Sequence, residues 1–191
     1  MKTNIIRIVL GIIFIITVLI GYIPQPQYLV EMTCISNTIA GILLIADGIL
    51  GMKSKKAIPS IAYLFLYIAL ILVFTVCMGS LTGMYHMNFE GAFFFLHVTN
   101  PIAFFIMYFC TVNERNESIK KCFYAPAFVM LYLLFDFILG KIRGEFVYGF
   151  VKPEDMGMIE TILTAIVMYA VFYLIGVVTF HINRRIHRSR E

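Results

Sequence analysis

The residues best suited to chemistry are a threonine, a histidine and two asparagines that lie inside long apolar stretches. Thr33 and Asn37 are four residues apart, and His97 precedes Asn100 by three. A threonine hydroxyl becomes a nucleophile when a neighbouring base takes its proton, and histidine titrates close to neutral pH. The carboxamide of Asn37 or Asn100 can donate to the oxyanion that forms during acyl transfer. This combination predicts a nucleophilic site for acyl chemistry.

Three further residues are candidates for supporting this site or binding its substrate. Glu31 and Ser36 lie close to Thr33 in the chain, and Asp136 lies near the end of a later apolar run. Either acid is a candidate for orienting His97, and the sequence does not choose between them. Polar side chains inside hydrocarbon are costly, so each of these residues is a functional candidate.

Each candidate also has a purely structural interpretation. A threonine in a membrane helix often bonds the carbonyl four residues before it, and a serine or asparagine often joins two helices. A single histidine commonly packs with its polar atoms satisfied. It is the occurrence of an alcohol, an imidazole and two amides at one depth that favours chemistry.

The histidine spacing does not predict a metal or cofactor site. His86 and His97 are not at a ligand spacing, and the sequence has no H-x-x-x-H or H-E-x-x-H motif. It also has no Walker A, G-x-S-x-G or Rossmann motif. We therefore expect no metal and no cofactor.

The composition defines the elements that must position these residues. Of the 191 residues, 61% are hydrophobic and 14% are charged, whereas soluble domains carry about 25% charged residues. This excludes a soluble enzyme and a disordered chain. Six apolar runs are long enough to cross a bilayer, which predicts an all-α, polytopic membrane helix bundle with six transmembrane helices in a single domain. The runs cover residues 5–23, 28–52, 57–78, 91–112, 123–139 and 157–180.

The distribution of lysine and arginine predicts the orientation in the membrane. All of these residues except Lys141, Arg143 and Lys152 lie on the side that holds both termini and the loops around Lys55 and Glu117. By the positive-inside rule, both termini are expected in the cytoplasm. The basic C-terminal tail is expected to contact anionic lipid, and no nucleic-acid partner is expected.

The helical rise predicts which polar residues share a depth. Thr33 and His97 each lie about six residues, or about 9 Å, from the predicted start of a helix that enters from the outer side. They are therefore expected to meet in the outer half of the bundle. Asp47 lies about 30 Å from that helix start, so we expect it at the cytoplasmic interface.

Three stretches resemble motifs of a known family, the six-helix androgen-induced and androgen-dependent membrane hydrolases. Residues 33–37, TCISN, resemble the T-x-x-S-N signature of its second helix. Residues 96–102, LHVTNPI, resemble its L-H-x-x-x-P-[IV] signature, and residues 142–150, IRGEFVYGF, are similar to its aromatic loop before the last helix. The resemblance spans the second to the sixth predicted helix.

The resemblance implies a threonine hydrolase of lipid esters, with Thr33 as the nucleophile and His97 as its partner. Animal members act on fatty-acid esters of hydroxy fatty acids, and this sequence resembles the prokaryotic members, which implies a bacterial plasma membrane. We expect an intramembrane hydrolase of lipid or fatty-acyl esters, with membrane lipids as substrates, or an acyltransferase that uses the same pair. The alternative is a non-enzymatic membrane protein, either a small-molecule carrier or a helper subunit.

Overall fold

The computed structural model divides the chain into two compact units, Met1–Asn113 and Glu114–Glu191. The residues that it describes are 1–55, 58–80, 90–144, 147 and 157–189. His86, Lys152 and most of the 142–150 stretch lie outside the described residues. The expectation of a single domain stays a prediction.

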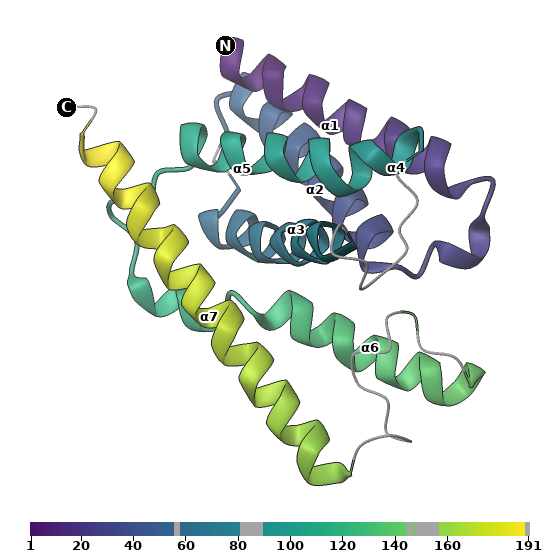
Figure 1. Cartoon of the computed structure of the whole chain (residues 1–191). Coiled ribbons are helices and arrows are strands. Elements are labelled where there is room, and N and C mark those ends of the chain that lie inside the picture. The colour runs from purple at the N-terminus through teal and green to yellow at the C-terminus, as the bar shows by residue number, and fades with distance from the viewer. Residues whose placement is uncertain (56–57, 81–89, 145–146, 148–156, 190–191) are drawn as a thin grey trace. The chain divides into compact units, whose positions relative to one another are not determined.

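Three long helices begin the first unit (Figure 1). They are α1 (Lys2–Tyr22), α2 (Met32–Met52) and α3 (Ser60–Ser80). A short 3-10 turn, η1 (Pro26–Tyr28), precedes α2, which therefore begins four residues later than predicted. The delay has a local cause, because Glu31 has the extended angles φ −66° and ψ 143° that are typical of a residue preceding a helix.

The fourth long segment of this unit is a helix that changes its winding. It runs without a break through α4 (Ala92–Phe94), the π-helix η2 (Phe95–Thr99) and α5 (Asn100–Thr111). The predicted run of 91–112 is thus correct in extent. Pro101, in the first turn of α5, explains the change in winding, because proline has no N–H to continue the α-helical ladder.

Close packing joins α1 to α2 at positions occupied by glycine (Figure 1). A Cβ atom on Gly11 would lie 2.6 Å from the carbonyl oxygen of Gly41, and one on Gly41 would lie 3.0 Å from that of Gly11. Small residues let membrane helices approach closely enough for their backbones to touch. This contact holds α2, which carries Thr33, against α1.

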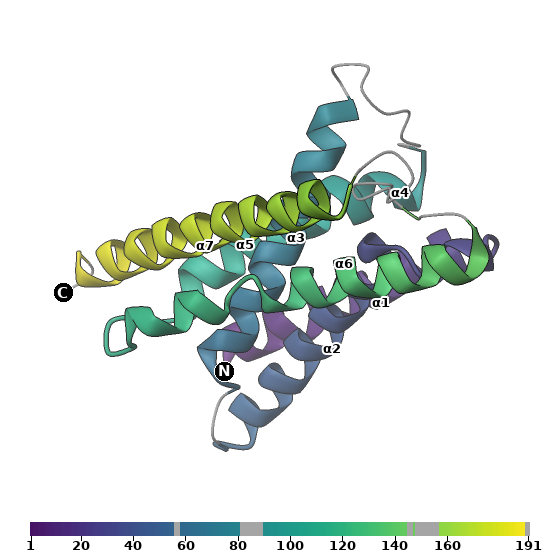
Figure 2. The same cartoon turned by 90° about the horizontal axis from the view of Figure 1, so that it is seen from below.

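The second unit contains η3 (Ile119–Tyr124) and two long helices, α6 (Ala127–Arg143) and α7 (Met158–Arg188) (Figure 2). Helix α6 lies four residues beyond the predicted run of 123–139. Pro126, which has no backbone N–H to continue the hydrogen bonds of η3, lies between η3 and α6. Gly144 ends α6 with the left-handed angle φ 76°.

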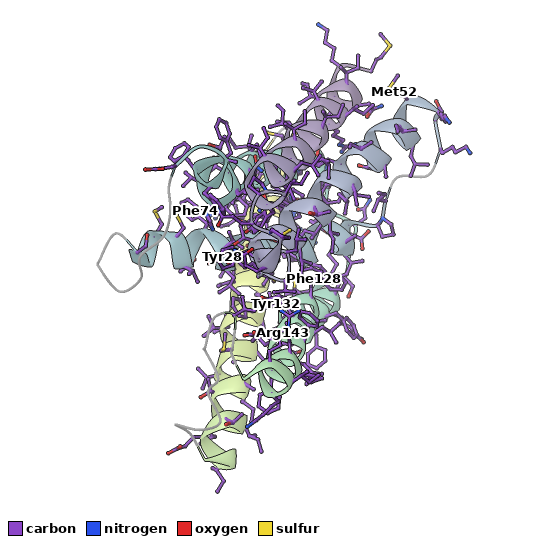
Figure 3. All side chains as sticks on the ribbon, turned by 90° about the vertical axis from the view of Figure 1, so that its right-hand side faces the viewer. Tyr28, Met52, Phe74, Phe128, Tyr132 and Arg143 are labelled. Carbon is purple, nitrogen blue, oxygen red and sulfur yellow. The ribbon has the colours of Figure 1, made fainter. Side chains whose placement is uncertain are left out.

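Six helical segments of the described residues are long and apolar enough to cross a membrane, and no strand occurs among those residues. The all-α fold class is therefore confirmed. Carbon-rich side chains project from the helices, and the labelled Tyr28 and Met52 are the last residues of η1 and α2 (Figure 3). Many large apolar residues are exposed, as Ile20 is at 62% and Leu174 at 59%. These surfaces are compatible with an integral multi-pass membrane protein.

Candidate functional site

Thr33 and His97 lie together inside the first unit. Thr33 Oγ1 is 3.4 Å from His97 Nε2, although the two residues are 64 positions apart in the chain. Thr33 is 2% exposed and His97 is 4% exposed. The expected meeting of these two side chains is therefore confirmed.

The other nitrogen of the His97 ring decides the role of Nε2. Nδ1 lies 2.8 Å from the Phe93 carbonyl oxygen. A carbonyl only accepts, so Nδ1 carries the ring proton and Nε2 of the neutral ring presents a lone pair. This geometry lets the Thr33 hydroxyl donate to Nε2, the direction that general-base catalysis needs. A carbonyl thus orients His97, where an acid from Glu31 or Asp136 had been considered.

The π-turn of η2 makes a second link between the two helices. The Asn100 N–H bonds the Phe95 carbonyl, five residues before it. The same pattern would pair the Leu96 carbonyl with Pro101, which has no N–H to give. The side-chain nitrogen of Asn37 supplies the missing donor to Leu96 at 3.1 Å. Proline and asparagine together therefore fix the backbone beside His97.

The two asparagines form a buried chain of hydrogen bonds. Asn37 Nδ2 also donates to the Thr33 carbonyl at 2.8 Å, and Asn37 Oδ1 accepts from Asn100 Nδ2 at 3.0 Å. Asn100 Nδ2 also donates to Thr17 Oγ1 on α1 at 3.0 Å. Each amide nitrogen has two N–H groups, and both are engaged in each asparagine. In this geometry the asparagines position the Thr33 and His97 segments, and neither has an N–H left for an oxyanion.

We call Thr33, Asn37, His97 and Asn100 the threonine cluster. Thr33 is the second residue of α2, and the expected depth of about 9 Å below the helix start was wrong for it, because α2 begins at Met32. This correction has a chemical consequence. The first turn of a helix carries the positive end of the helix dipole, which favours negative charge there.

Glu31 approaches the cluster through two aromatic residues. Its Oε2 accepts a 2.7 Å hydrogen bond from the Tyr22 hydroxyl. The Tyr22 ring packs edge-on against Phe93, whose ring is stacked on the His97 ring with centroids 6.1 Å apart. Burial raises the pKa of the Glu31 carboxyl above its ordinary value of 4.5, and the Tyr22 hydroxyl opposes this rise. The Tyr22 and Phe93 rings thus lie between Glu31 and His97.

The two remaining predicted residues take different positions. Ser36 is buried, and its hydroxyl makes a long 3.5 Å bond to the Thr33 carbonyl. Asp136 belongs to the second unit, where its Oδ1 accepts a 2.9 Å hydrogen bond from the Val147 N–H. Of these two predicted residues, Ser36 therefore lies beside Thr33, whereas Asp136 binds the backbone that follows α6.

Three residues of the site were missed by the sequence analysis: Thr17, Tyr22 and Phe93. Thr17 and Tyr22 are polar residues within the first apolar run, so their cost in hydrocarbon was an available signal. Phe93 contributes its backbone carbonyl as well as its ring. The amino-acid sequence gives no signal for a carbonyl acceptor, because every residue carries a backbone carbonyl.

A second buried polar group, the aspartate cluster of Arg7, Asp47 and Tyr63, lies near the other end of α2. Asp47 Oδ2 is 2.9 Å from Arg7 Nη1 and accepts a 2.6 Å bond from the Tyr63 hydroxyl. Asp47 Oδ1 accepts from the Ile58 N–H at 3.0 Å. Asp47 is 2% exposed, so it lies inside the unit, where these donors compensate for its burial.

Within the described ranges, no group of three His, Cys, Asp or Glu side chains is placed to hold a metal ion. A scan against protein-family models and searches of curated proteins and solved structures find no match to this chain. The resemblance to membrane hydrolases therefore stays a hypothesis. The chemistry of the site follows from its own geometry.

Proposed function

We propose that this chain is an intramembrane hydrolase of lipid or fatty-acyl esters, with Thr33 as the nucleophile and His97 as the general base. The observation that carries the proposal is the Thr33 Oγ1 to His97 Nε2 contact, combined with the Phe93 carbonyl on Nδ1. Apo contacts between nucleophile and base are often long and tighten with substrate. The 3.4 Å distance suits that role.

The reaction divides into acylation and deacylation. Thr33 Oγ1 attacks the ester carbonyl carbon while its proton moves to His97 Nε2. Collapse of the tetrahedral intermediate breaks the ester C–O bond, and the alcohol leaves with the proton from Nε2. Water then attacks the acyl-threonine with the same base, releases the fatty acid and restores the Thr33 hydroxyl. An alcohol in place of water gives the acyltransferase reaction.

Two features of the site support the development of negative charge on Thr33. The first turn of α2 carries the positive end of its dipole, and helix N-termini stabilise developing alkoxides and oxyanions. Thr33 and His97 are also shielded from bulk water, since both are buried. Electrostatic interactions are stronger in such surroundings than in water.

The surroundings of the pair support an apolar substrate. Neighbouring residues Met32, Cys34 and Leu96 are all buried and hydrophobic. A lipid ester brings its acyl chain into such surroundings without losing hydration, whereas a polar substrate pays for desolvation. The resemblance of residues 33–37 and 96–102 to membrane hydrolase motifs points to the same substrate class.

We further propose that the protein resides in a bacterial plasma membrane, as the resemblance to prokaryotic members implies. The distribution of lysine and arginine supports an orientation with both termini in the cytoplasm. Cysteine labelling in intact cells tests this orientation. An impermeant reagent is expected to reach Gln25→Cys but not Ser118→Cys. The reverse pattern excludes the proposed topology.

Activity-based labelling tests the catalytic proposal. The purified full-length protein is treated with a fluorophosphonate, and the modified residue is identified by peptide mass spectrometry. We expect modification at Thr33, and its loss in Thr33→Val, which keeps the volume and removes the hydroxyl. Thr38→Val is the matched control, because Thr38 Oγ1 bonds the Cys34 carbonyl at 2.8 Å on the same helix. Ester hydrolysis at the wild-type rate by folded Thr33→Val refutes the mechanism.

A further inference from the structure

The last helix is longer than a membrane crossing requires. Helix α7 contains 31 residues, which corresponds to about 46 Å, whereas the hydrocarbon core of a bilayer is about 30 Å thick. Its described residues from Thr161 to Ser189 contain no acid, and its basic residues gather in the last turns. An apolar helix with a basic end places that end among lipid headgroups.

Four basic or titratable residues of this end form one helical face. His181, Arg184, Arg185 and Arg188 are separated by three and four residues, the spacing that aligns side chains on a helix. We call them the basic face. Together with Ile182 they line a cavity of about 560 Å³. This volume is large enough for a phosphate-bearing headgroup.

The charges of the basic face are not balanced within the described part of the chain. No described carboxylate forms an ion pair with Arg184, Arg185 or Arg188. Like charges at these spacings repel each other. Arg184 Nε is buried without a hydrogen-bond partner, and the Arg184 guanidinium lies 5.4 Å from the Phe180 ring centre. An anion at this position relieves the repulsion.

An apolar stripe leads directly to the basic face. Val171, Leu174, Val178 and Ile182 are all exposed and share one side of α7. Arg185 follows Ile182 by three residues and therefore continues the same side. A free phosphate has no apolar group that could pack against this stripe. An acyl chain lies along it while its headgroup reaches the arginines.

We propose that the basic face binds an anionic phospholipid that carries more than one negative charge, with its acyl chains along the apolar stripe. Three guanidinium groups without a described counter-ion leave a surplus of positive charge when a singly charged headgroup binds. Arginine also matches the geometry of phosphate oxygens with paired N–H donors. A lipid with two phosphates fits both the charge and the spacing. This inference does not depend on the proposed hydrolase activity.

Native mass spectrometry of the full chain in detergent micelles tests the proposal. The probes are cardiolipin with two phosphates, phosphatidylglycerol with one, and neutral phosphatidylcholine, with inorganic phosphate as competitor. The test variant is Arg185→Gln/Arg188→Gln, and the single variant Arg188→Gln accompanies it. The matched control is Lys53→Gln/Lys55→Gln, which removes two exposed charges just after the end of α2.

We expect one cardiolipin per chain, bound more tightly than phosphatidylglycerol, with phosphatidylcholine weakest. Near an anionic surface each basic residue changes affinity by about fivefold, so the double variant should lose about twenty-five-fold and the single variant about fivefold. The control should bind cardiolipin as the wild type does. An equal loss in the control shows a general charge effect and overturns the site. Equal binding of cardiolipin and phosphatidylglycerol, or displacement by inorganic phosphate, overturns the assignment to a doubly charged lipid.

Discussion

The threonine cluster and the aspartate cluster lie on the same side of α2 and differ in how they satisfy their polar atoms. Thr33 and Asp47 are 14 residues apart, about 21 Å along the helix. Asp47 is charged, and Arg7, Tyr63 and the Ile58 N–H compensate it. Thr33 and His97 form a neutral pair with a defined direction for a proton.

This difference in hydrogen bonding suits the aspartate cluster to stabilising the fold and the threonine cluster to the proposed reaction. The Asp47 carboxylate is held between a cation and two further donors, and it joins the starts of α1 and α3 to α2. The threonine cluster uses its asparagines to fix the backbone and leaves the hydroxyl and imidazole facing each other. Buried polarity alone therefore does not distinguish the proposed reactive pair from the aspartate cluster, whereas the direction of the hydrogen bonds does.

The largest expected effect concerns the Thr33 and His97 pair. Loss of a general base slows reaction by about a hundredfold to ten-thousandfold, so His97→Ala should slow fluorophosphonate modification of Thr33 to that extent. Adding Thr33→Val should then cost little more in ester hydrolysis, since residues that act as one unit are non-additive. Hydrolysis assays of both single variants and the double variant measure this. Independent, additive losses contradict the joint role.

The next effect falls on stability. Asp47→Asn leaves Arg7 buried with no opposing charge, and breaking a buried pair costs about 3 to 5 kcal/mol. Unfolding in mixed micelles should show this loss, while protein that remains folded still reacts at Thr33. Arg7→Met/Asp47→Leu removes both charges and should be less damaging than Asp47→Asn. If Asp47→Asn unfolds like the wild type, the structural role of the aspartate cluster is wrong.

A smaller effect is expected from the asparagine that joins α2 to η2. Asn37→Ala removes the donors to the Thr33 and Leu96 carbonyls. A displacement of about 1 Å costs up to about a hundredfold in rate, so we expect labelling to slow by tenfold to a hundredfold. Ser36→Ala is the control, because its 3.5 Å bond is too long to contribute much. Equal rates for the two variants argue against positioning by Asn37.

The smallest effect is a dependence on pH. Burial raises the pKa of Glu31 above 4.5 in the folded protein, so the folded state holds the proton more tightly than the unfolded state. This stabilisation is complete below pH 4.5 and is lost as pH rises through the raised pKa. Thermal melts should therefore show the wild type losing stability relative to Glu31→Gln above pH 4.5.

Tyr22→Phe sharpens the same measurement. The Tyr22 hydroxyl lowers the pKa of Glu31, so its removal should shift the loss of stability to higher pH. Identical pH profiles for the wild type and Tyr22→Phe contradict the hydrogen bond.

The sequence predicted the helices because the cost of exposing backbone to hydrocarbon leaves long apolar runs few alternatives. It also predicted the meeting of Thr33 and His97 from their matched depths, although the depth was wrong for Thr33 because α2 begins at Met32. The helix starts depended on local angles, such as those of Glu31, that apolar runs do not report. The roles of Asn37 and Phe93 depended on carbonyl acceptors, and every residue carries a carbonyl whatever its side chain.

The π-turn at Pro101 also constrains how this site can change during evolution. Asn37 donates to the Leu96 carbonyl, which Pro101 leaves without a backbone N–H donor. A descendant that loses the proline no longer needs Asn37 for the Leu96 carbonyl, although Asn37 still bonds the Thr33 carbonyl and Asn100. One that loses only the asparagine carries an unsatisfied carbonyl at Leu96 as well. Residue 96 contributes only its backbone to this bond, whereas its buried side chain packs with Val18, Tyr22 and Cys34. Positions 37 and 101 should therefore covary although neither side chain needs to touch the other.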